Sequence, residues 1–210
     1  MLFLTNPEAT NDALAILRDG TNFQWYVIFM LVAVLFIYFS EVNKKNFRGI
    51  AAGLLVYMIH WLAEIINALI QAASGHALWT VPKGTSFLIL IGVGIELSLM
   101  FSIAGLAMSR LLSDDPKKKI LKLPAPLFIG LFNAALASGI EIFLVMTPAF
   151  VWIYEWWNAL TVFVFVYIPF FVVGAYGYYW KPKKQKYVIL VLLIIIITML
   201  VIFGGIMGII

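Results

Sequence analysis

One apolar stretch of the chain, near residues 50–72, carries polar side chains at helical spacing. Residues three and four apart lie on one face of an α-helix, and the spacings in this stretch alternate between these two values. That face must point into a bundle interior or a wet cavity, because hydrocarbon offers no partners to its donors and acceptors. The row consists of Gly53, Tyr57, His60, Glu64, Asn67 and Gln71.

Further polar residues recur in the later apolar stretches. Glu96 stands alone in the third, Asn133 and Glu141 share one helical face in the fourth, and Asn158 and Thr161 open the fifth. A charged carboxylate at membrane depth costs about 2.5–3 kcal/mol or more, so each needs a partner or a purpose. Counting from the ends of the stretches places the glutamates and Asn158 in the outer half of the membrane. We therefore expect one shared cavity.

Three interpretations of this cluster stay open. In a purely structural role, His60 and Asn67 would hydrogen-bond protonated carboxyl groups across helices and hold these helices together. As a metal site, His60 and Glu64 could chelate from adjacent turns, but paired Glu-x-x-His motifs are absent. As acid–base machinery, His60 and Glu64 would share a proton while another carboxyl group titrates differently in apolar surroundings. We favour acid–base chemistry without metal or cofactor, the catalytic residues being His60, Glu64, Glu96 and Glu141.

The elements that position these residues must be membrane helices. The 210 residues are 64% hydrophobic and 11% charged, with a mean hydropathy of +1.03, whereas soluble domains carry roughly 25% charged residues. The chain has no cysteine, which excludes disulfides and thiol nucleophiles. Six stretches are long enough to cross a hydrocarbon core of about 30 Å. They cover residues 23–40, 50–72, 87–109, 125–147, 157–179 and 187–210.

The basic residues predict the orientation of the bundle. All of the 14 Lys and Arg residues except Arg18 and Lys83 fall in the loops after the first, third and fifth stretches. The positive-inside rule places these three loops in the cytoplasm and both termini outside. The net charge of +4 therefore has a topological cause and does not imply a nucleic-acid partner. The sequence predicts an all-α, polytopic transmembrane bundle in a plasma or inner membrane or the endoplasmic reticulum.

The chain divides into three predicted parts. Residues 1–22 are polar and read as a helix at the membrane surface, residues 23–186 form a five-helix core with the polar cavity, and residues 187–210 form a peripheral sixth helix. In the third stretch, small residues that include Gly105 recur at helical spacing and would let a neighbouring helix approach closely.

At the polar residues the sequence resembles the emopamil-binding-protein family, membrane proteins with an EXPERA domain that include sterol isomerases and sigma-2-receptor-like proteins. Residues 59–64 (Ile-His-Trp-Leu-Ala-Glu) are similar to the Ile-His-x-x-x-Glu stretch of the isomerases, and Glu96 and Glu141 follow on the next helices as acidic residues do there. Residues 158–161 (Asn-Ala-Leu-Thr) are similar to an Asn-Ala-Leu-Trp stretch. The resemblance implies that His60, Glu64 and Glu96 transfer protons and that Asn158 lines the pocket.

These observations lead to one expected function and two alternatives. We expect an enzyme that isomerises or cyclises an isoprenoid- or sterol-like lipid through a carbocation. A lipid- or sterol-binding protein without turnover and a proton- or cation-coupled transporter are the alternatives. The expected partners are membrane lipids and a hydrophobic small molecule, with a homodimer left open. The expected substrate-binding residues are Tyr57, Asn67, Asn133, Asn158 and Thr161.

Overall fold

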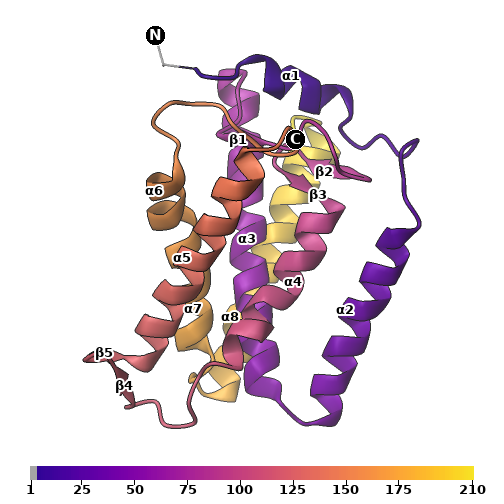
Figure 1. Ribbon diagram of the computed structural model, residues 1–210. Helices are drawn as coiled ribbons and strands as arrows, with labels where there is room; N and C mark the ends of the chain where they lie inside the picture. The colour runs from indigo at the N-terminus through magenta and orange to yellow at the C-terminus, as the bar shows by residue number, and fades with distance from the viewer. Residues whose placement is uncertain (1–3) are drawn as a thin grey trace.

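Five long apolar helical segments run side by side and form the membrane part of the protein (Figure 1). The computed structural model describes residues 4–210. Segments of 18 residues or more with this composition can cross a bilayer core, so the prediction of a helical membrane bundle is confirmed. The segments are α2 (Tyr26–Asn43), α3 (Phe47–Ser74), α5 (Ala125–Val145), the run of α6 (Ala159–Val162), η1 (Phe163–Tyr167) and α7 (Ile168–Gly177), and α8 (Pro182–Met199) with η2 (Leu200–Ile206).

The remaining apolar segment is shorter than the sequence predicts. Instead of a helix over residues 87–109, the chain forms a hairpin of β2 (Leu88–Leu90) and β3 (Val93–Gly94), followed by α4 (Ile95–Ser109). Leu88 and Leu90 are buried. A short apolar run such as Leu-Ile-Leu-Ile cannot be assigned to helix or strand from hydrophobicity alone, and the flanking glycines at 92 and 94 favour a tight turn.

Two-stranded pairings and a short helix cover the end of the bundle at which the C-terminus lies (Figure 1). There β1 (Trp79–Thr80) pairs antiparallel with β6 (Val151–Trp152), and the α1 helix (Glu8–Ala15) buries Ala9, Thr10 and Ala13. A second hairpin, β4 (Lys119–Ile120) with β5 (Leu123–Pro124), lies at the opposite end. We call α1, β1, β6 and the β2–β3 hairpin the cap.

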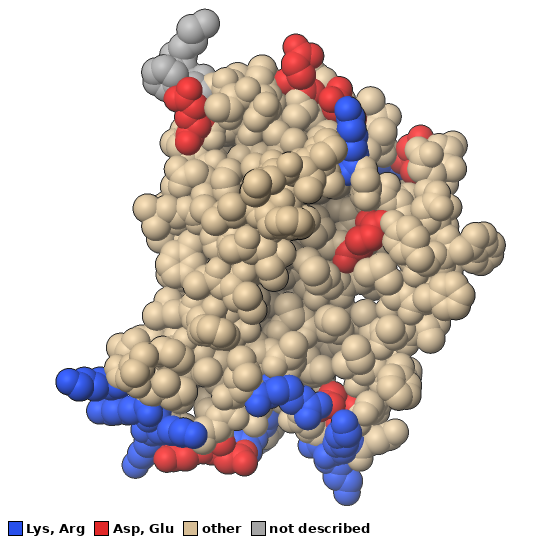
Figure 2. Space-filling view, in the orientation of Figure 1, with Lys and Arg blue, Asp and Glu red and all other residues tan. Residues whose placement is uncertain are grey.

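Lys and Arg side chains gather at the end opposite the cap (Figure 2). This end holds the α2–α3 connection and the β4–β5 hairpin, which are among the basic loops that the sequence analysis assigns to one side. The acidic residues are distributed over both ends. The two ends of the helical bundle therefore differ in their content of basic residues.

Small residues let two helices approach α3 closely at one point. A Cβ atom at Gly105 on α4 would lie 2.6 Å from Val56 of α3, and one at Gly174 on α7 would lie 2.4 Å from the same side chain. Real Cβ atoms do not come so near, so only glycine permits this packing. The predicted close approach along α4 is confirmed at Gly105, and α3 becomes the central helix.

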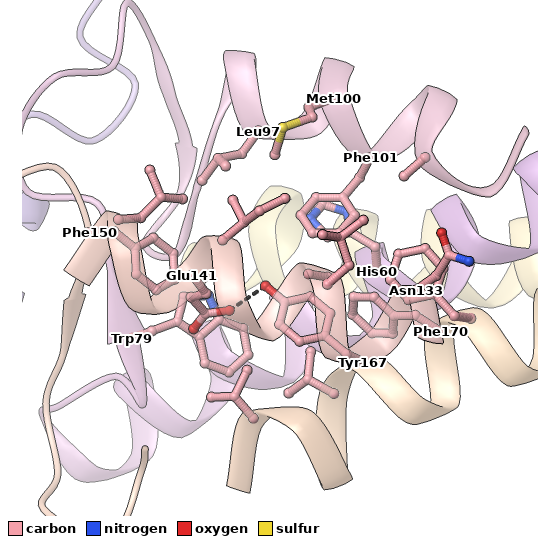
Figure 3. Close-up of a pocket in the computed structure, with 18 of the residues that line it drawn as sticks. His60, Trp79, Leu97, Met100, Phe101, Asn133, Glu141, Phe150, Tyr167 and Phe170 are labelled. Carbon is pink, nitrogen blue, oxygen red and sulfur yellow. Dashed lines mark hydrogen bonds between the residues drawn. The ribbon is translucent and has the colours of Figure 1, made fainter. Parts of the chain in front are cut away.

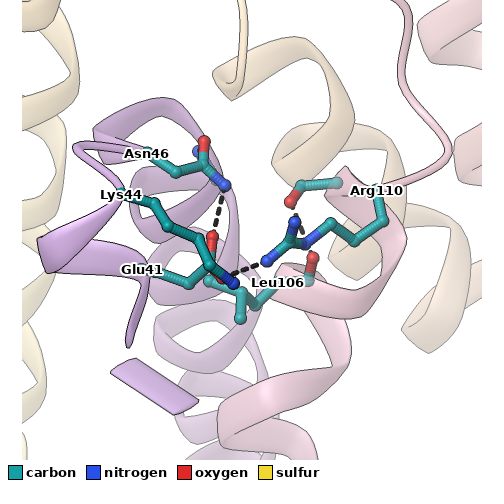
Figure 4. Close-up of polar contacts among 7 residues, drawn as sticks. Glu41, Lys44, Asn46, Leu106 and Arg110 are labelled. Atoms are coloured by element: carbon teal, nitrogen blue, oxygen red, sulfur yellow. Dashed lines mark hydrogen bonds and ion pairs between the residues drawn. The ribbon is translucent and has the colours of Figure 1, made fainter. Parts of the chain in front are cut away.

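Polar contacts attach α2, most of whose surface is exposed, to α4 at both of its ends. At the basic end, the buried carboxylate of Glu41 accepts a hydrogen bond of 2.6 Å from Asn46 Nδ2 and pairs with Arg110 (Figure 4). At the other end, the hydroxyl of Tyr26 donates a hydrogen bond of 2.5 Å to Glu96. Because lipid cannot supply such partners, these contacts hold α2 in place.

The predicted orientation can be tested by cysteine labelling, since the chain has no cysteine of its own. In intact cells, Gly20→Cys should react with a membrane-impermeant maleimide, and Leu121→Cys, in the exposed turn of the β4–β5 hairpin, should react only after permeabilisation. By the positive-inside rule, we expect the basic loops, and that hairpin with them, to lie in the cytoplasm. The reverse pattern would contradict the orientation.

Candidate functional site

A cavity of about 230 Å³ lies inside the bundle (Figure 3). Its walls come from α3, α4, α5 and the α6–η1–α7 segment, and Trp79 and Phe150 contribute to it from the cap side. Most of the lining is apolar or aromatic. Only a few polar side chains reach the cavity, and they are His60, Glu64, Asn133, Glu141 and Tyr167.

His60 and Glu64 form a buried pair one helical turn apart on α3. Their side chains are 1% and 7% exposed, and His60 Nε2 lies 3.4 Å from Glu64 Oε1 without the geometry of a hydrogen bond. The imidazole stacks on Phe101, with 4.2 Å between ring centroids. Among the described residues neither ring nitrogen has a hydrogen-bond partner, nor has Glu64 Oε2. An unpaired buried polar atom costs roughly 1–3 kcal/mol, so this pair has unused capacity to bind.

Glu141 also faces the cavity but is fully hydrogen-bonded. Its Oε1 accepts a bond of 2.6 Å from Trp152 Nε1, and its Oε2 accepts a bond from the hydroxyl of Tyr167 (Figure 3). The side chain is buried, and Glu64 lines the same cavity. One cavity thus holds two carboxyl groups with different surroundings, one with both oxygens bonded and one with a free oxygen.

A π-helical turn carries Tyr167 to this position. The N–H of Ile168 bonds to the carbonyl of Phe163, five residues back, instead of four. Pro169 follows, and because proline has no N–H and crowds the preceding turn, it favours such a widened turn. Neither Tyr167 nor Trp152 is among the site residues predicted from the sequence. The proline inside an apolar stretch was the available signal for Tyr167.

Glu96 does not share the cavity, so the prediction of one common site is wrong for this residue. Its carboxylate accepts hydrogen bonds from Tyr26, from Thr85 Oγ1 at 2.6 Å and from the backbone N–H of Ser86 at 2.7 Å. Because α4 begins only at Ile95, Glu96 sits in the first turn of that helix. There it joins α4 to α2 and to the loop before β2. With Glu96 elsewhere, no three His, Asp or Glu side chains within residues 4–210 come together as a metal site.

Two expected substrate-binding residues of α3 bond to protein groups outside the cavity. Asn67 donates from Nδ2 to the carbonyl of Trp79 at 2.9 Å and accepts from the N–H of Leu78 at 2.7 Å. It therefore fixes the cap to α3. Tyr57 shares a hydrogen bond of 2.9 Å with Ser98 of α4. The row of polar residues on α3 does lie along one face of the helix. The residues at its two ends bond to neighbouring elements, and only its middle, His60 and Glu64, faces the cavity.

Asn158 and Thr161 also lie outside the cavity lining. Asn158 is the N-cap of α6, and its side chain and that of Thr161 bond to each other's backbone N–H groups in a capping box. This satisfies donors at a helix start and explains the three-residue spacing. Asn133 does line the cavity, although its Nδ2 bonds back to the carbonyl of Ile129 at 2.9 Å.

The β2–β3 turn packs against Glu64 from the cap side. A Cβ atom at Gly92 would lie 2.4 Å from Trp79 Nε1, 2.5 Å from Asn67 Nδ2 and 2.7 Å from Glu64 Oε2. Glycine is the residue that allows the hairpin to come this close. The unexpected strand pair thus forms part of the wall behind Glu64.

The fold and its cavity define a polytopic α-helical membrane protein with ionisable side chains buried between its helices. Residues 7–205 match the model of a family described as "Uncharacterized membrane protein family", and the chain belongs to that family. It is 42% identical over 205 residues to a protein of Archaeoglobus fulgidus described as "Uncharacterized protein", a match that covers 95% of this chain and 97% of the relative. No solved structure matches the chain.

The resemblance to the emopamil-binding-protein family is therefore wrong. The family that matches nearly the whole chain is a different one, and the archaeal relative carries no EXPERA description. The motifs behind the resemblance are short, and residues of two of them have other roles in the structure. Glu96 joins α4 to α2, and Asn158 caps a helix. Short polar patterns of this kind arise in any helical bundle with polar contacts between its helices.

A structural role for Glu96 predicts a loss of stability on its neutralisation. Glu96→Gln removes the charge that three donors share and turns an amide N–H₂ toward one of them, so the free energy of unfolding should fall by about 1–3 kcal/mol. Thermal unfolding in detergent measures this change. Glu155→Gln, at an exposed position, is the control and should leave the transition in place. An unchanged transition for Glu96→Gln would contradict this role.

Gly92→Ala should disturb the packing of the cap and of Glu64 together. Its new Cβ would overlap atoms of Trp79, Asn67 and Glu64, and such overpacking costs about 1–3 kcal/mol. Gly20→Ala, where the new Cβ has no neighbour within 4 Å, is the control in the same unfolding measurement. Equal stability of the two variants would show that the hairpin does not pack as described.

Proposed function

We propose that this protein is an intramembrane acid–base enzyme that moves a double bond, or closes a ring, in an isoprenoid-like substrate taken from the bilayer. The observation that carries the proposal is the pair of His60 and Glu64. Both are buried, both have unpaired atoms, and both face the same apolar cavity as the hydrogen-bonded Glu141. Unpaired polar groups in an apolar site are a property of sites that bind and change a ligand.

The proposed reaction uses one proton donor and one proton acceptor. The His60–Glu64 pair donates a proton to one carbon of a double bond, and the π electrons form the new C–H bond and leave a cation on the neighbouring carbon. In isomerisation, Glu141 removes a proton from the next carbon, and those C–H electrons form the shifted double bond. In cyclisation, a second double bond attacks the cation before that proton is lost. One proton enters and one leaves, and it returns to the pair before the next turnover.

The cavity walls suit a cationic intermediate. Aromatic rings of Phe101, Phe170, Tyr167 and Trp79 line the cavity, and the face of an aromatic ring attracts a cation by roughly 0.5–2 kcal/mol. The two carboxyl groups add charge stabilisation in surroundings of low dielectric constant. Because the apolar walls also exclude water, the cation would lose a proton rather than gain a hydroxyl group.

The basic loops assign the membrane side of this chemistry. With those loops in the cytoplasm, the cavity lies toward the outer half of a plasma or inner membrane or of the endoplasmic reticulum. The substrate would then come from the membrane that holds the protein.

A second candidate is a lipid-binding protein without turnover. Glu141 favours it, because a carboxylate already bonded by Trp152 and Tyr167 is arranged as a structural group would be. In that case the His60–Glu64 pair would hydrogen-bond a polar group of the lipid.

Deuterium exchange separates these functions. The purified protein in lipid nanodiscs is incubated in D₂O with all-trans-geranylgeraniol, and mass spectrometry measures deuterium bound to carbon. The enzyme should incorporate deuterium, whereas His60→Ala, Glu64→Gln and Glu141→Gln should each lower the rate by about 10²-fold or more, as loss of acid–base catalysis does. Glu155→Gln should match the wild type. Thermal unfolding shows whether each variant is folded.

Three outcomes would overturn the proposal. Full exchange in a folded Glu64→Gln protein would remove the pair from catalysis. Binding of the alcohol without exchange would leave the lipid-binding function. Proton flux in liposomes that depends on His60 and Glu64, with no altered lipid, would indicate a transporter.

A further inference from the structure

The cavity is open on one side, between α4 and α5. Three apolar side chains in its lining are also exposed at the molecular surface: Met100 of α4 by 41%, and Leu136 and Ile140 of α5 by 54% and 47%. The surface is hollowed between these two helices (Figure 2). Because α5 spans the membrane and α4 runs beside it, this opening faces hydrocarbon and not water. We call it the mouth.

Small side chains leave the mouth unobstructed. Ala104 and Ala107 of α4 and Ala137 of α5 belong to the cavity lining. The volume of about 230 Å³ lies below the roughly 300–1,000 Å³ of pockets that enclose a drug-sized ligand. A lipid can therefore place one end inside, and the rest of the molecule must lie in the mouth and in the bilayer.

The charges of the lining select an uncharged ligand end. The ionisable side chains that line the cavity are His60, Glu64, Glu141 and Tyr167, and no Lys or Arg lines it in the part of the chain that the structure describes. Phosphate groups are usually bound by Arg, Lys or helix N-termini. Two glutamates repel such a group, whereas an uncharged hydroxyl group can hydrogen-bond to the His60–Glu64 pair, whose buried polar atoms lack partners in the described structure.

We infer that the substrate is a linear, uncharged isoprenoid that inserts its hydroxyl end sideways between α4 and α5. The hydroxyl group bonds to the His60–Glu64 pair, the nearest double bond lies in the cavity, and the remaining chain passes the three alanines into the bilayer. This inference rests on the proposed function for the chemical reaction. The identity of the ligand is inferred separately, from the shape and charge of the cavity. On this inference, rigid fused-ring lipids and chains with a diphosphate head are not substrates.

Photocrosslinking in nanodiscs tests this ligand class. The probe is geranylgeraniol with a diazirine either next to the hydroxyl end or at the far end of the chain. Peptide mapping should place the first adduct on cavity residues such as Phe101 and the second on mouth residues such as Leu136 or on lipid. Unlabelled geranylgeraniol should compete, and cholesterol and geranylgeranyl diphosphate should not.

Two alanines of α5 provide a matched pair of variants. Ala137 lines the cavity, whereas Ala135 is exposed and does not line it. Ala137→Phe should fill the mouth and lower the yield of cavity adducts about tenfold, because its ring occupies the space through which the probe must pass. Ala135→Phe should leave the yield within about twofold of the wild type. Equal yields for both variants would overturn the lateral route.

The results separate the ligand from the reaction. Cavity adducts without deuterium exchange would support the linear ligand and overturn the enzymatic function. Deuterium exchange into a fused-ring sterol, with no cavity adduct from the linear probe, would support the enzymatic function and overturn the inferred substrate. Efficient competition by the diphosphate would also overturn the uncharged head.

Discussion

Within a bilayer, every polar group must find its partner inside the protein, because hydrocarbon offers none. This constraint accounts for most of the buried polar contacts of the molecule. Glu41 is bonded by Asn46 and paired with Arg110, and Glu96 has three hydrogen-bond donors around it. These pairings attach the otherwise exposed helix α2 to α4. Membrane glutamates are thus not a uniform signal of catalysis, and their partners decide what each one does.

Two buried residues, His60 and Glu64, are exceptions to this constraint. His60 and Glu64 are as buried as the satisfied groups but leave three polar atoms without a partner in the described structure. Glu141, in the same cavity, has both oxygens bonded. Two carboxyl groups in one apolar cavity therefore have unequal surroundings, which is the condition under which one group can give a proton while another takes one. The proposed lateral route of a hydrophobic molecule to both groups passes through the mouth between α4 and α5.

The cap shows how the capped end of the bundle and the site depend on each other. Asn67 holds the cap strands to α3, and Gly92 brings the β2–β3 turn against Glu64. On the other side, Trp152 of β6 bonds to Glu141. Short strands that look like ordinary connections thus contact two of the four ionisable groups that line the cavity, Glu64 and Glu141. The site is held between the membrane helices and the cap, and neither part forms it alone.

The sequence by itself determined the membrane bundle, the distribution of basic loops and the pairing of His60 with Glu64, because hydropathy and helical spacing are local properties. It did not determine which faces meet. The rotation of one helix against another placed Glu96 beside Tyr26 and brought Tyr167 to Glu141. The hairpin at residues 88–94 also could not be predicted from the sequence, since a short apolar run fits a strand as well as a helix. Only the tertiary structure decided these points, because each depends on partners distant in the chain.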